Sequence, residues 1–158
     1  MEIRFATAAD VTGILELLRQ VGQVHHAGRP DLFRAGAQKY SASGVLALLN
    51  NSHTPIFVAA EEGEVKGYCF CQIKEVSQDP VMTDRVELYI DDLCVEETCR
   101  GRGVATALYR HTAAWAKENG CSHISLNVWC GNDGAMAFYE AMGLRPRHIM
   151  MEQSLEEV

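Results

Sequence analysis

The fold is decided by the stretch Asp91-Asp-Leu-Cys-Val-Glu-Glu-Thr-Cys-Arg-Gly-Arg-Gly-Val-Ala-Thr-Ala-Leu108. It starts in a segment rich in β-formers, turns through Arg100–Gly103 and continues as a helical pattern. Small residues in such a turn let the backbone approach a ligand closely. The helix that follows offers unpaired N–H groups and the positive end of its dipole, which suit an anion. The spacing therefore predicts a strand–turn–helix unit that either binds an anion or is simply a tight turn.

Two common phosphate-binding loops do not fit this turn. A Walker loop needs Lys-Ser or Lys-Thr after its second glycine, and no such pair follows Gly101 or Gly103. A dinucleotide-binding loop needs a third glycine and follows the first strand of a βαβ unit, whereas this turn lies late in the chain. The spacing alone leaves the nature of the anion open.

The remaining sequence predicts alternating strands and helices. The expected strands cover residues 2–6, 56–61, 65–76, 85–95 and 123–128, with one or two more in 144–155. The expected helices cover residues 11–21, 104–119 and 134–142, with a short one after Ser41, while residues 22–40 are partly loop. No linker or repeat divides this order, so we expect one α+β domain with a mixed sheet over residues 1–158.

Composition narrows the class of protein. The 158 residues are 47% hydrophobic and 22% charged, which is typical of a globular domain. A net charge of −7 argues against a nucleic-acid partner and is compatible with cationic ones. No apolar run approaches the roughly 20 residues of a membrane span, and the first residues do not resemble a signal peptide. We therefore expect a cytoplasmic protein without a membrane partner.

The six cysteines do not predict a metal site. No Cys-x-x-Cys pair occurs among them, so a structural zinc ion is not expected. Several lie in apolar runs, where a free cysteine behaves as a small hydrophobe. We expect reduced, buried thiols.

Two motifs carry a family resemblance. Arg100-Gly-Arg-Gly103-Val-Ala105 resembles the signature Arg/Gln-x-x-Gly-x-Gly/Ala of the GNAT superfamily of N-acetyltransferases. Downstream, Leu126–Asn132, Ala135 and Phe138-Tyr-Glu-Ala-Met-Gly-Leu144 resemble the Asn, small residue and Phe-Tyr-x-x-x-Gly-Phe/Leu that the family shows there. The order of elements also agrees, so the resemblance covers nearly the whole chain.

The resemblance implies acetyl-CoA as co-substrate and no metal. It implies a GNAT-like α/β sandwich, in which helices flank a mixed, mostly antiparallel sheet and a splayed strand pair holds CoA. The strand end pairs with the pantetheine arm like an added strand, the turn holds the pyrophosphate, and an asparagine hydrogen-bonds the cofactor or only caps its helix. The residues implied are Leu93, Cys94, Val95, Arg100, Gly101, Arg102, Gly103, Val104, Ala105 and Asn132.

The same resemblance implies direct acetyl transfer without a covalent acyl-enzyme. Tyr139 is the expected acid for the departing thiolate, the alternative being that its ring only packs in a helical face. Asp91 is the expected base, ahead of Asp92, with Tyr89 and Glu87 as further candidates. Since adjacent strand residues face opposite sides of a sheet, at most one of the two aspartates is expected to face the acceptor.

The acceptor implied is a primary amine of a small molecule or peptide. Asn127 stands where some relatives that acetylate protein N-termini carry a glutamate base, which disfavours that activity. Residues 24–33 are expected to line the acceptor groove, with His25 and His26 either in the site or in a solvated loop. Members of the family are often dimers, and Ile149–Met151 is a candidate edge for a homodimer. The alternative function is an acetyl-CoA sensor without turnover.

Overall fold

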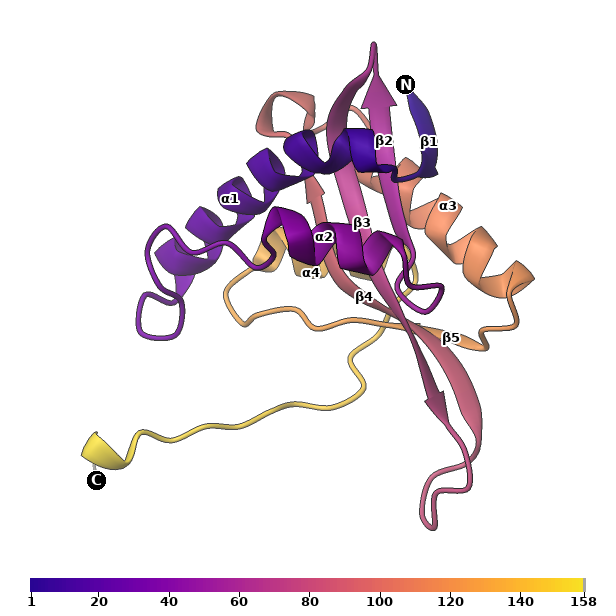
Figure 1. The fold of residues 1–158 in the computed structure, drawn as a ribbon. Coiled ribbons are helices and arrows are strands. Elements are labelled where there is room, and N and C mark those ends of the chain that lie inside the picture. Colours follow the sequence, from indigo (N-terminus) through magenta and orange to yellow (C-terminus); the bar gives the residue numbers. More distant parts are fainter. Residues whose placement is uncertain (158) are drawn as a thin grey trace. The chain divides into compact units, whose positions relative to one another are not determined.

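The computed structural model describes residues 1–157 of the chain, which divides into two units, residues 1–127 and the residues from 128 onward. The first unit contains a five-stranded sheet (Figure 1). The strands lie side by side in chain order as β1 (Glu2–Phe5), β2 (Ile56–Glu61), β3 (Glu64–Val76), β4 (Arg85–Val95) and β5 (His123–Ser125). The first four are antiparallel neighbours, and β4 and β5 are parallel. The expected mixed, mostly antiparallel sheet is confirmed.

Helices cover both faces of this sheet. Helices α1 (Val11–Gly28) and α2 (Ala42–Leu49) lie on one face, and α3 (Val104–Glu118) lies on the other (Figure 1). The alternation of β2 shows why, because successive side chains of a strand point to opposite faces. Ile56 and Val58 belong to the core beneath α1, whereas Phe57 contacts His111 and Trp115 of α3.

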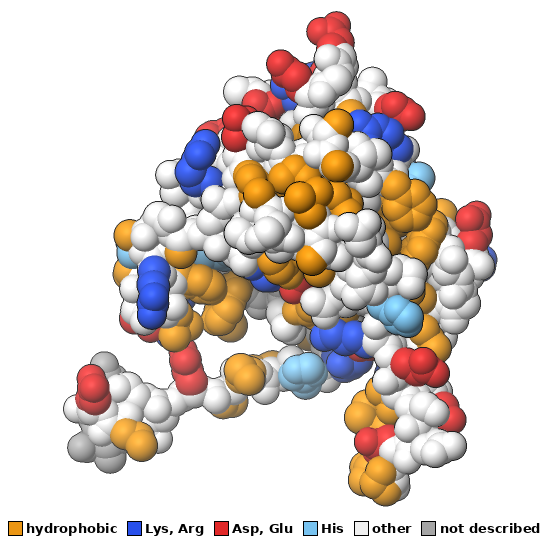
Figure 2. All heavy atoms as spheres, viewed as in Figure 1, with side chains coloured by type: hydrophobic (Ala, Val, Ile, Leu, Met, Phe, Trp, Pro, Cys, Tyr) orange, Lys and Arg blue, Asp and Glu red, His pale blue; other side chains and the backbone are white. Residues whose placement is uncertain are grey.

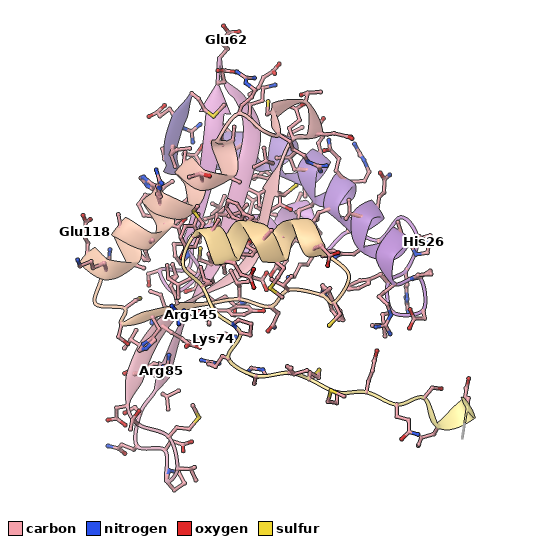
Figure 3. The ribbon with its side chains drawn as sticks, turned by 180° about the vertical axis from the view of Figure 1, so that it is seen from behind. His26, Glu62, Lys74, Arg85, Glu118 and Arg145 are labelled. Atoms are coloured by element: carbon pink, nitrogen blue, oxygen red, sulfur yellow. The ribbon has the colours of Figure 1, made fainter. Side chains whose placement is uncertain are left out.

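Several local predictions are confirmed, and the ends of one helix and one strand differ from the predicted positions. Glu62 and Gly63 both have positive φ and form the predicted two-residue turn between β2 and β3, with Glu62 at its tip (Figure 3). Helix α1 continues to Gly28, beyond the expected end at residue 21. Strand β5 ends at Ser125, three residues before the expected end, because only Glu87–Tyr89 of β4 pair with it.

The hairpin that joins β3 and β4 is long. Strand β3 has 13 residues and β4 has 11, and Lys74 and Arg85 mark the arms of the hairpin in Figure 3. Apolar side chains are exposed at its tip (Figure 2), where Val81 is 90% exposed. The polar connection predicted for residues 78–84 is confirmed, apart from these apolar residues within it.

The second unit contains helix α4 (Asp133–Ala141) and a short 3-10 turn at Leu155–Glu157. The prediction of one or two strands in residues 144–155 is wrong, because residues 144–154 adopt no strand. Ile149, Met150 and Met151 are each at least 77% exposed. A segment of β-forming residues needs a neighbouring strand for its backbone groups, and β-propensity alone does not supply one.

The buried carboxylate of Asp10 binds two residues near the start of the chain, Arg4 and Thr7. Asp10 is 4% exposed and accepts two hydrogen bonds from Arg4, at 2.8 and 2.9 Å, and one from the N–H of Thr7 at 2.7 Å. The Arg4 guanidinium lowers the pKa of Asp10 to about 2, although burial acts in the opposite direction. Because the folded pKa lies below the unfolded one, this stabilisation is present above pH ~4 and is lost as the pH falls through ~2.

We expect Asp10→Asn to lower the free energy of unfolding by about 2 kcal/mol at pH 7, because it removes the bidentate ion pair of a buried carboxylate. Urea unfolding at pH 7 and pH 3 measures this, and the gap to wild type should narrow at pH 3. Glu2→Gln is the matched control, since Glu2 is an exposed partner of the same Arg4 at 3.9 Å and should cost under ~0.5 kcal/mol. Equal losses in the two variants would contradict this account.

Candidate active site

The turn before α3 has the backbone that its glycines predict. Gly101 and Gly103 have φ of 74° and 80°, in the left-handed region that glycine adopts without strain. Gly103 is the N-cap of α3 and has no side chain with which to cap the helix. The first N–H groups of α3 lack partners within the helix, so they remain available to an anion. The turn is anchored beneath by Cys99, which is buried and donates its N–H to the carbonyl of Glu96 at 2.9 Å.

Two arginines add positive charge to this turn. Arg100 is exposed, and its backbone is extended. Arg102 lies 3.9 Å from the carboxylate of Glu61, and its guanidinium contacts the thiol of Cys99 at 3.8 Å. Neither contact is a short ion pair, so the electrostatics of the turn suit an anionic group.

Strands β4 and β5 separate after a short pairing. Their register stops at Tyr89 and Ser125, and the side-chain amide of Asn127 donates to the Tyr89 hydroxyl at 3.1 Å just beyond it. The last residues of β4, Leu93–Val95, pair with β3 on their other edge. The expected splay is therefore present, and within the described residues its inner edge has no paired strand.

Cys94 lies on this strand end and is buried, with its thiol 3.9 Å from the carbonyl of Leu17. Burial raises the pKa of the Cys94 thiol to about 12. A thiol that stays protonated near neutral pH is a poor nucleophile. The geometry agrees with its expected role as a strand residue.

A β-bulge at Asp91 changes the expected orientation of the two aspartates. Phe70 of β3 is opposite Asp92 and Cys71 is opposite Ile90, so Asp91 is an extra residue in β4. A bulge of this kind interrupts the alternation of side chains. The expectation that the two aspartates face opposite sides of the sheet therefore does not hold, and which of them faces the acceptor stays a prediction.

Aromatic contacts identify the face to which both aspartates turn. The Tyr40 ring stacks on Phe70 at 5.3 Å, and Tyr68 packs edge-on against the same ring at 5.0 Å. The Tyr40 hydroxyl donates to Asp91 at 2.7 Å, and that of Tyr68 donates to Asp92 at 2.8 Å. Phe70 and Tyr68 belong to the core beneath α1, so both carboxylates lie on the α1 and α2 face of the sheet.

Asp91 is engaged by the segment between α1 and α2. Lys39 Nζ lies 2.9 Å from its Oδ2 and donates to its main-chain carbonyl at 3.2 Å. Burial, followed by the hydrogen bond to Asp91, raises the pKa of Tyr40, so this hydroxyl is a stable donor. Lys39 and Tyr40 could not be predicted as site residues from the sequence, because they precede the short helix α2 without any motif spacing.

Asp92 has a different environment. Burial raises its pKa, and the Tyr68 hydroxyl, Lys39 and His25 each oppose that shift. Burial disfavours the charged form of a carboxyl, and a hydrogen bond or a nearby cation favours it. The two neighbouring carboxylates are thus distinguished by environment, since Asp91 is paired with a cation and Asp92 is bound by a neutral phenol.

The other residues singled out in the sequence have local partners. The His25 ring stacks on Phe33 at 5.0 Å, and His26, labelled near the end of α1 in Figure 3, has Nδ1 2.7 Å from the Phe33 carbonyl. Both histidines thus hold the loop that follows α1. Glu87 is buried beside Arg85 at 3.3 Å, and the ring of Tyr89 lies 3.5 Å beneath the ammonium of Lys74.

In the second unit, Asn132 caps α4, and its side-chain oxygen accepts from the N–H of Ala135 at 3.2 Å. The half-buried positions of the helix and its C-cap are Ala135, Phe138, Tyr139 and Met142. They form the helical face that the sequence predicts. The cap role of Asn132 is confirmed, and a role toward a cofactor stays a prediction.

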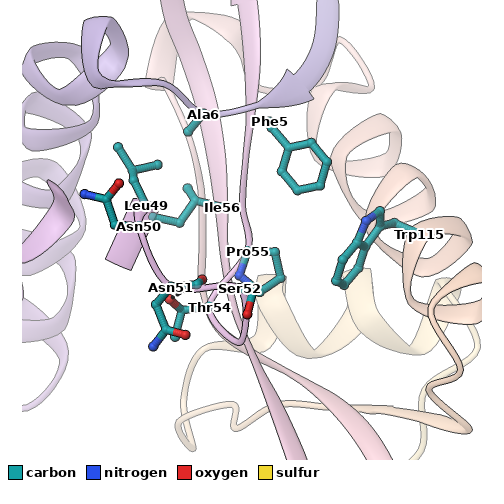
Figure 4. Close-up of a pocket in the computed structure, with 10 residues that line it drawn as sticks. All are labelled: Phe5, Ala6, Leu49, Asn50, Asn51, Ser52, Thr54, Pro55, Ile56 and Trp115. Atoms are coloured by element: carbon teal, nitrogen blue, oxygen red, sulfur yellow. Dashed lines mark hydrogen bonds between the residues drawn. The ribbon is translucent and has the colours of Figure 1, made fainter. Parts of the chain in front are cut away.

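A surface pocket of about 510 Å³ lies elsewhere in the first unit (Figure 4). Its walls include Phe5, Leu49 and Trp115 together with uncharged polar residues, and none of its lining side chains titrates. It contains none of the predicted site residues and offers no acid or base. Within residues 1–157, no group of three or more His, Cys, Asp or Glu side chains is placed to hold a metal, and no helix is long and apolar enough to cross a membrane.

Comparisons with known proteins agree with this geometry. A variant of the BH1408 protein of Bacillus halodurans has the same fold with a TM-score of 0.93 and 31% identity, over 98% of this chain and 99% of that one. A thialysine N-epsilon-acetyltransferase of Bos taurus is 24% identical over 147 residues, which are 89% of this chain and 82% of that protein. An uncharacterized N-acetyltransferase of Methanocaldococcus jannaschii is 27% identical over 103 residues, and the match spans only 44% of its length.

The family model named Acetyltransferase (GNAT) family matches residues 21–144, which include the splayed strand, the glycine turn and α4. The chain belongs to the GNAT family of acetyltransferases.

Proposed function

We propose that this protein transfers the acetyl group of acetyl-CoA directly to a primary amine of a small molecule or peptide. One observation carries the proposal: the unpaired edge of β4 ends at Val95 and is followed, after a 3-10 turn at Glu97–Cys99, by the glycine turn whose N–H groups begin α3. An extended arm beside a strand followed by an anion at a helix N-terminus is the shape of pantetheine joined to pyrophosphate. Family membership supports the same donor.

The donor would be held mainly by backbone. Leu93, Cys94 and Val95 supply the strand edge, and residues 100–105 supply N–H groups and the charges of two arginines. Asn132, at the start of α4, is proposed to hydrogen-bond the cofactor with the amide nitrogen that its capping contact leaves unused. Bound acetyl-CoA supplies the acetyl group as a thioester.

Asp91 is proposed as the base. An alkylammonium has a pKa near ~10 and must lose a proton before its nitrogen can attack a carbonyl. Asp91 is an anchored carboxylate at the splayed strand end, held by Tyr40 and Lys39 of the segment between α1 and α2. Asp92, beside it, is the second candidate because burial raises its pKa toward the range of a useful base.

Tyr139 is proposed as the acid. In direct transfer the amine nitrogen forms a bond to the acetyl carbon, the carbon–sulfur bond breaks, and the sulfur takes a proton from the tyrosine hydroxyl. Its place in the Phe-Tyr-x-x-x-Gly pattern supports this role, and its half-buried position on α4 also fits packing alone.

Named relatives indicate the range of acceptors. They include a thialysine N-epsilon-acetyltransferase, an N-alpha-acetyltransferase and a streptothricin acetyltransferase. The first two names specify a nitrogen acceptor. A sensor that binds acetyl-CoA without turnover is the alternative, and acid and base candidates within one chain favour the enzyme.

The donor site predicts unequal effects for two glycines of the same helix. We expect Gly103→Ala to weaken CoA binding about tenfold or more, because alanine at a φ of 80° is strained and displaces the N–H groups. Gly120 ends the same helix with the same φ, and space for a Cβ is open at both positions. Gly120→Ala should therefore cost similar stability and leave CoA affinity unchanged. Calorimetric titration with CoA checks this, and equal affinities in the two variants would remove the turn from the donor site.

The proton-transfer roles predict distinct kinetic defects. Tyr139→Phe keeps the ring and should lower kcat by a factor of about 10² or more without changing CoA affinity. Asp91→Asn should also lower kcat/KM, and that defect should shrink as the pH approaches ~10, where the amine loses its proton without a base. Turnover and its pH profile, at saturating acetyl-CoA, measure both. Unchanged turnover in Tyr139→Phe removes it as the acid, and a pH-dependent defect only in Asp92→Asn transfers the base role to Asp92.

A further inference from the structure

The ammonium of Lys39 is held at the proposed base by three groups. Its Nζ lies 2.9 Å from the Asp91 carboxylate, donates to the Asp91 carbonyl at 3.2 Å, and stands 5.8 Å from the centre of the Tyr40 ring. A carboxylate, a carbonyl and an aromatic face are the groups that bind an alkylammonium. The chain thus places one of its own primary amines on the residue that would accept a proton from the acceptor.

The bulge explains why this position can hold an ammonium. Asp91 is the extra residue of β4 and falls outside the register with β3, and β5 no longer pairs at this level. A bulged residue does not take part in the regular hydrogen bonding between strands, so its carbonyl and its carboxylate can bind the same ligand. The Tyr40 hydroxyl fixes the carboxylate at 2.7 Å, and the Tyr40 ring is fixed in turn by stacking on Phe70.

The two partners of this ion pair differ in how firmly they are held. The Asp91 side chain is 12% exposed, whereas that of Lys39 is 45% exposed. Lys39 belongs to the irregular segment between α1 and α2, and its four-carbon stem has many rotamers. A half-exposed ion pair is weak. The Lys39 side chain can therefore leave the Asp91 carboxylate without a change in the positions of Asp91 and Tyr40.

We propose that Lys39 is a specificity-determining residue whose ammonium occupies the position of the acceptor's ammonium, and that an acceptor binds by displacing it. This inference rests on the proposed function. The acceptor class it names is a flexible primary alkylamine that, like the lysine side chain, presents its ammonium at the end of an apolar stem. Because Lys39 competes for the same carboxylate, the apparent KM equals the intrinsic KM divided by the fraction of time that the position is vacated.

The test uses n-butylamine, which reproduces the lysine side chain as a free molecule. With saturating acetyl-CoA, we expect Lys39→Met to lower the KM for n-butylamine about five- to tenfold, with a smaller change in kcat. Lys39→Arg keeps the charge and should stay close to wild type. Lys117→Met makes the same change of net charge on the exposed last turn of α3 and should leave KM unchanged, which separates displacement from long-range attraction.

A binding measurement makes the result independent of turnover. Calorimetric titration should show n-butylamine binding more tightly to Lys39→Met than to wild type, and the gain should vanish in Lys39→Met/Asp91→Asn. An unchanged or higher KM, or a gain in affinity that persists without the Asp91 carboxylate, would overturn the role of Lys39. Absence of turnover with every amine in all variants, alongside the expected gain in binding, would instead contradict the proposed function and leave the role of Lys39 standing.

Discussion

The bulge at Asp91 is the constraint on which the proposed acceptor side of the molecule depends. One extra residue in β4, placed just after β5 has stopped pairing, turns two successive carboxylates to the same face of the sheet. Each carboxylate then receives its own tyrosine hydroxyl, from Tyr40 and from Tyr68. In a regular strand, one of the two would face α3 instead. The local irregularity therefore concentrates titratable groups at the point where the strands separate.

The donor side rests on a different kind of constraint. The left-handed backbone at Gly101 and Gly103 brings the chain from the end of β4 into α3 without a capping side chain. Side-chain chemistry contributes little to the proposed donor site, whereas the proposed acceptor side depends on specific carboxylates, phenols and an ammonium. We propose that such a division lets one fold serve different acceptors, since relatives of this chain are named for different ones.

The sequence was most informative where a short-range rule applies. Glu62-Gly63, Gly103, Gly120 and Asn132 occupy the turn, cap and helix-end positions that their residue types predict, because these roles are set by local backbone geometry. The splay was also predicted, although only through the family resemblance. The alternation of side chains along a regular strand gave a wrong prediction for the faces of Asp91 and Asp92, since nothing in the residue types marks a bulge.

Interactions distant in sequence could not be predicted. Lys39 and Tyr40 reach Asp91 across more than 50 residues, and no spacing connects them. The absence of strands in residues 144–154 is a related case, since Ile149–Met151 have β-propensity but no described neighbour with which to pair. Pairing partners and side-chain contacts are tertiary properties, and local propensity does not determine them.

The central claim is acetyl transfer to a primary amine, and the most direct measurement is release of free CoA from acetyl-CoA in the presence of an amine panel. The panel would contain alkylamines, polyamines, aminoglycosides, free amino acids and peptides with free N-termini or lysines. Our account predicts turnover well above acetyl-CoA hydrolysis with at least one class, and greatest with flexible primary alkylamines. Tight binding of acetyl-CoA without CoA release for any amine would contradict the account and identify a sensor.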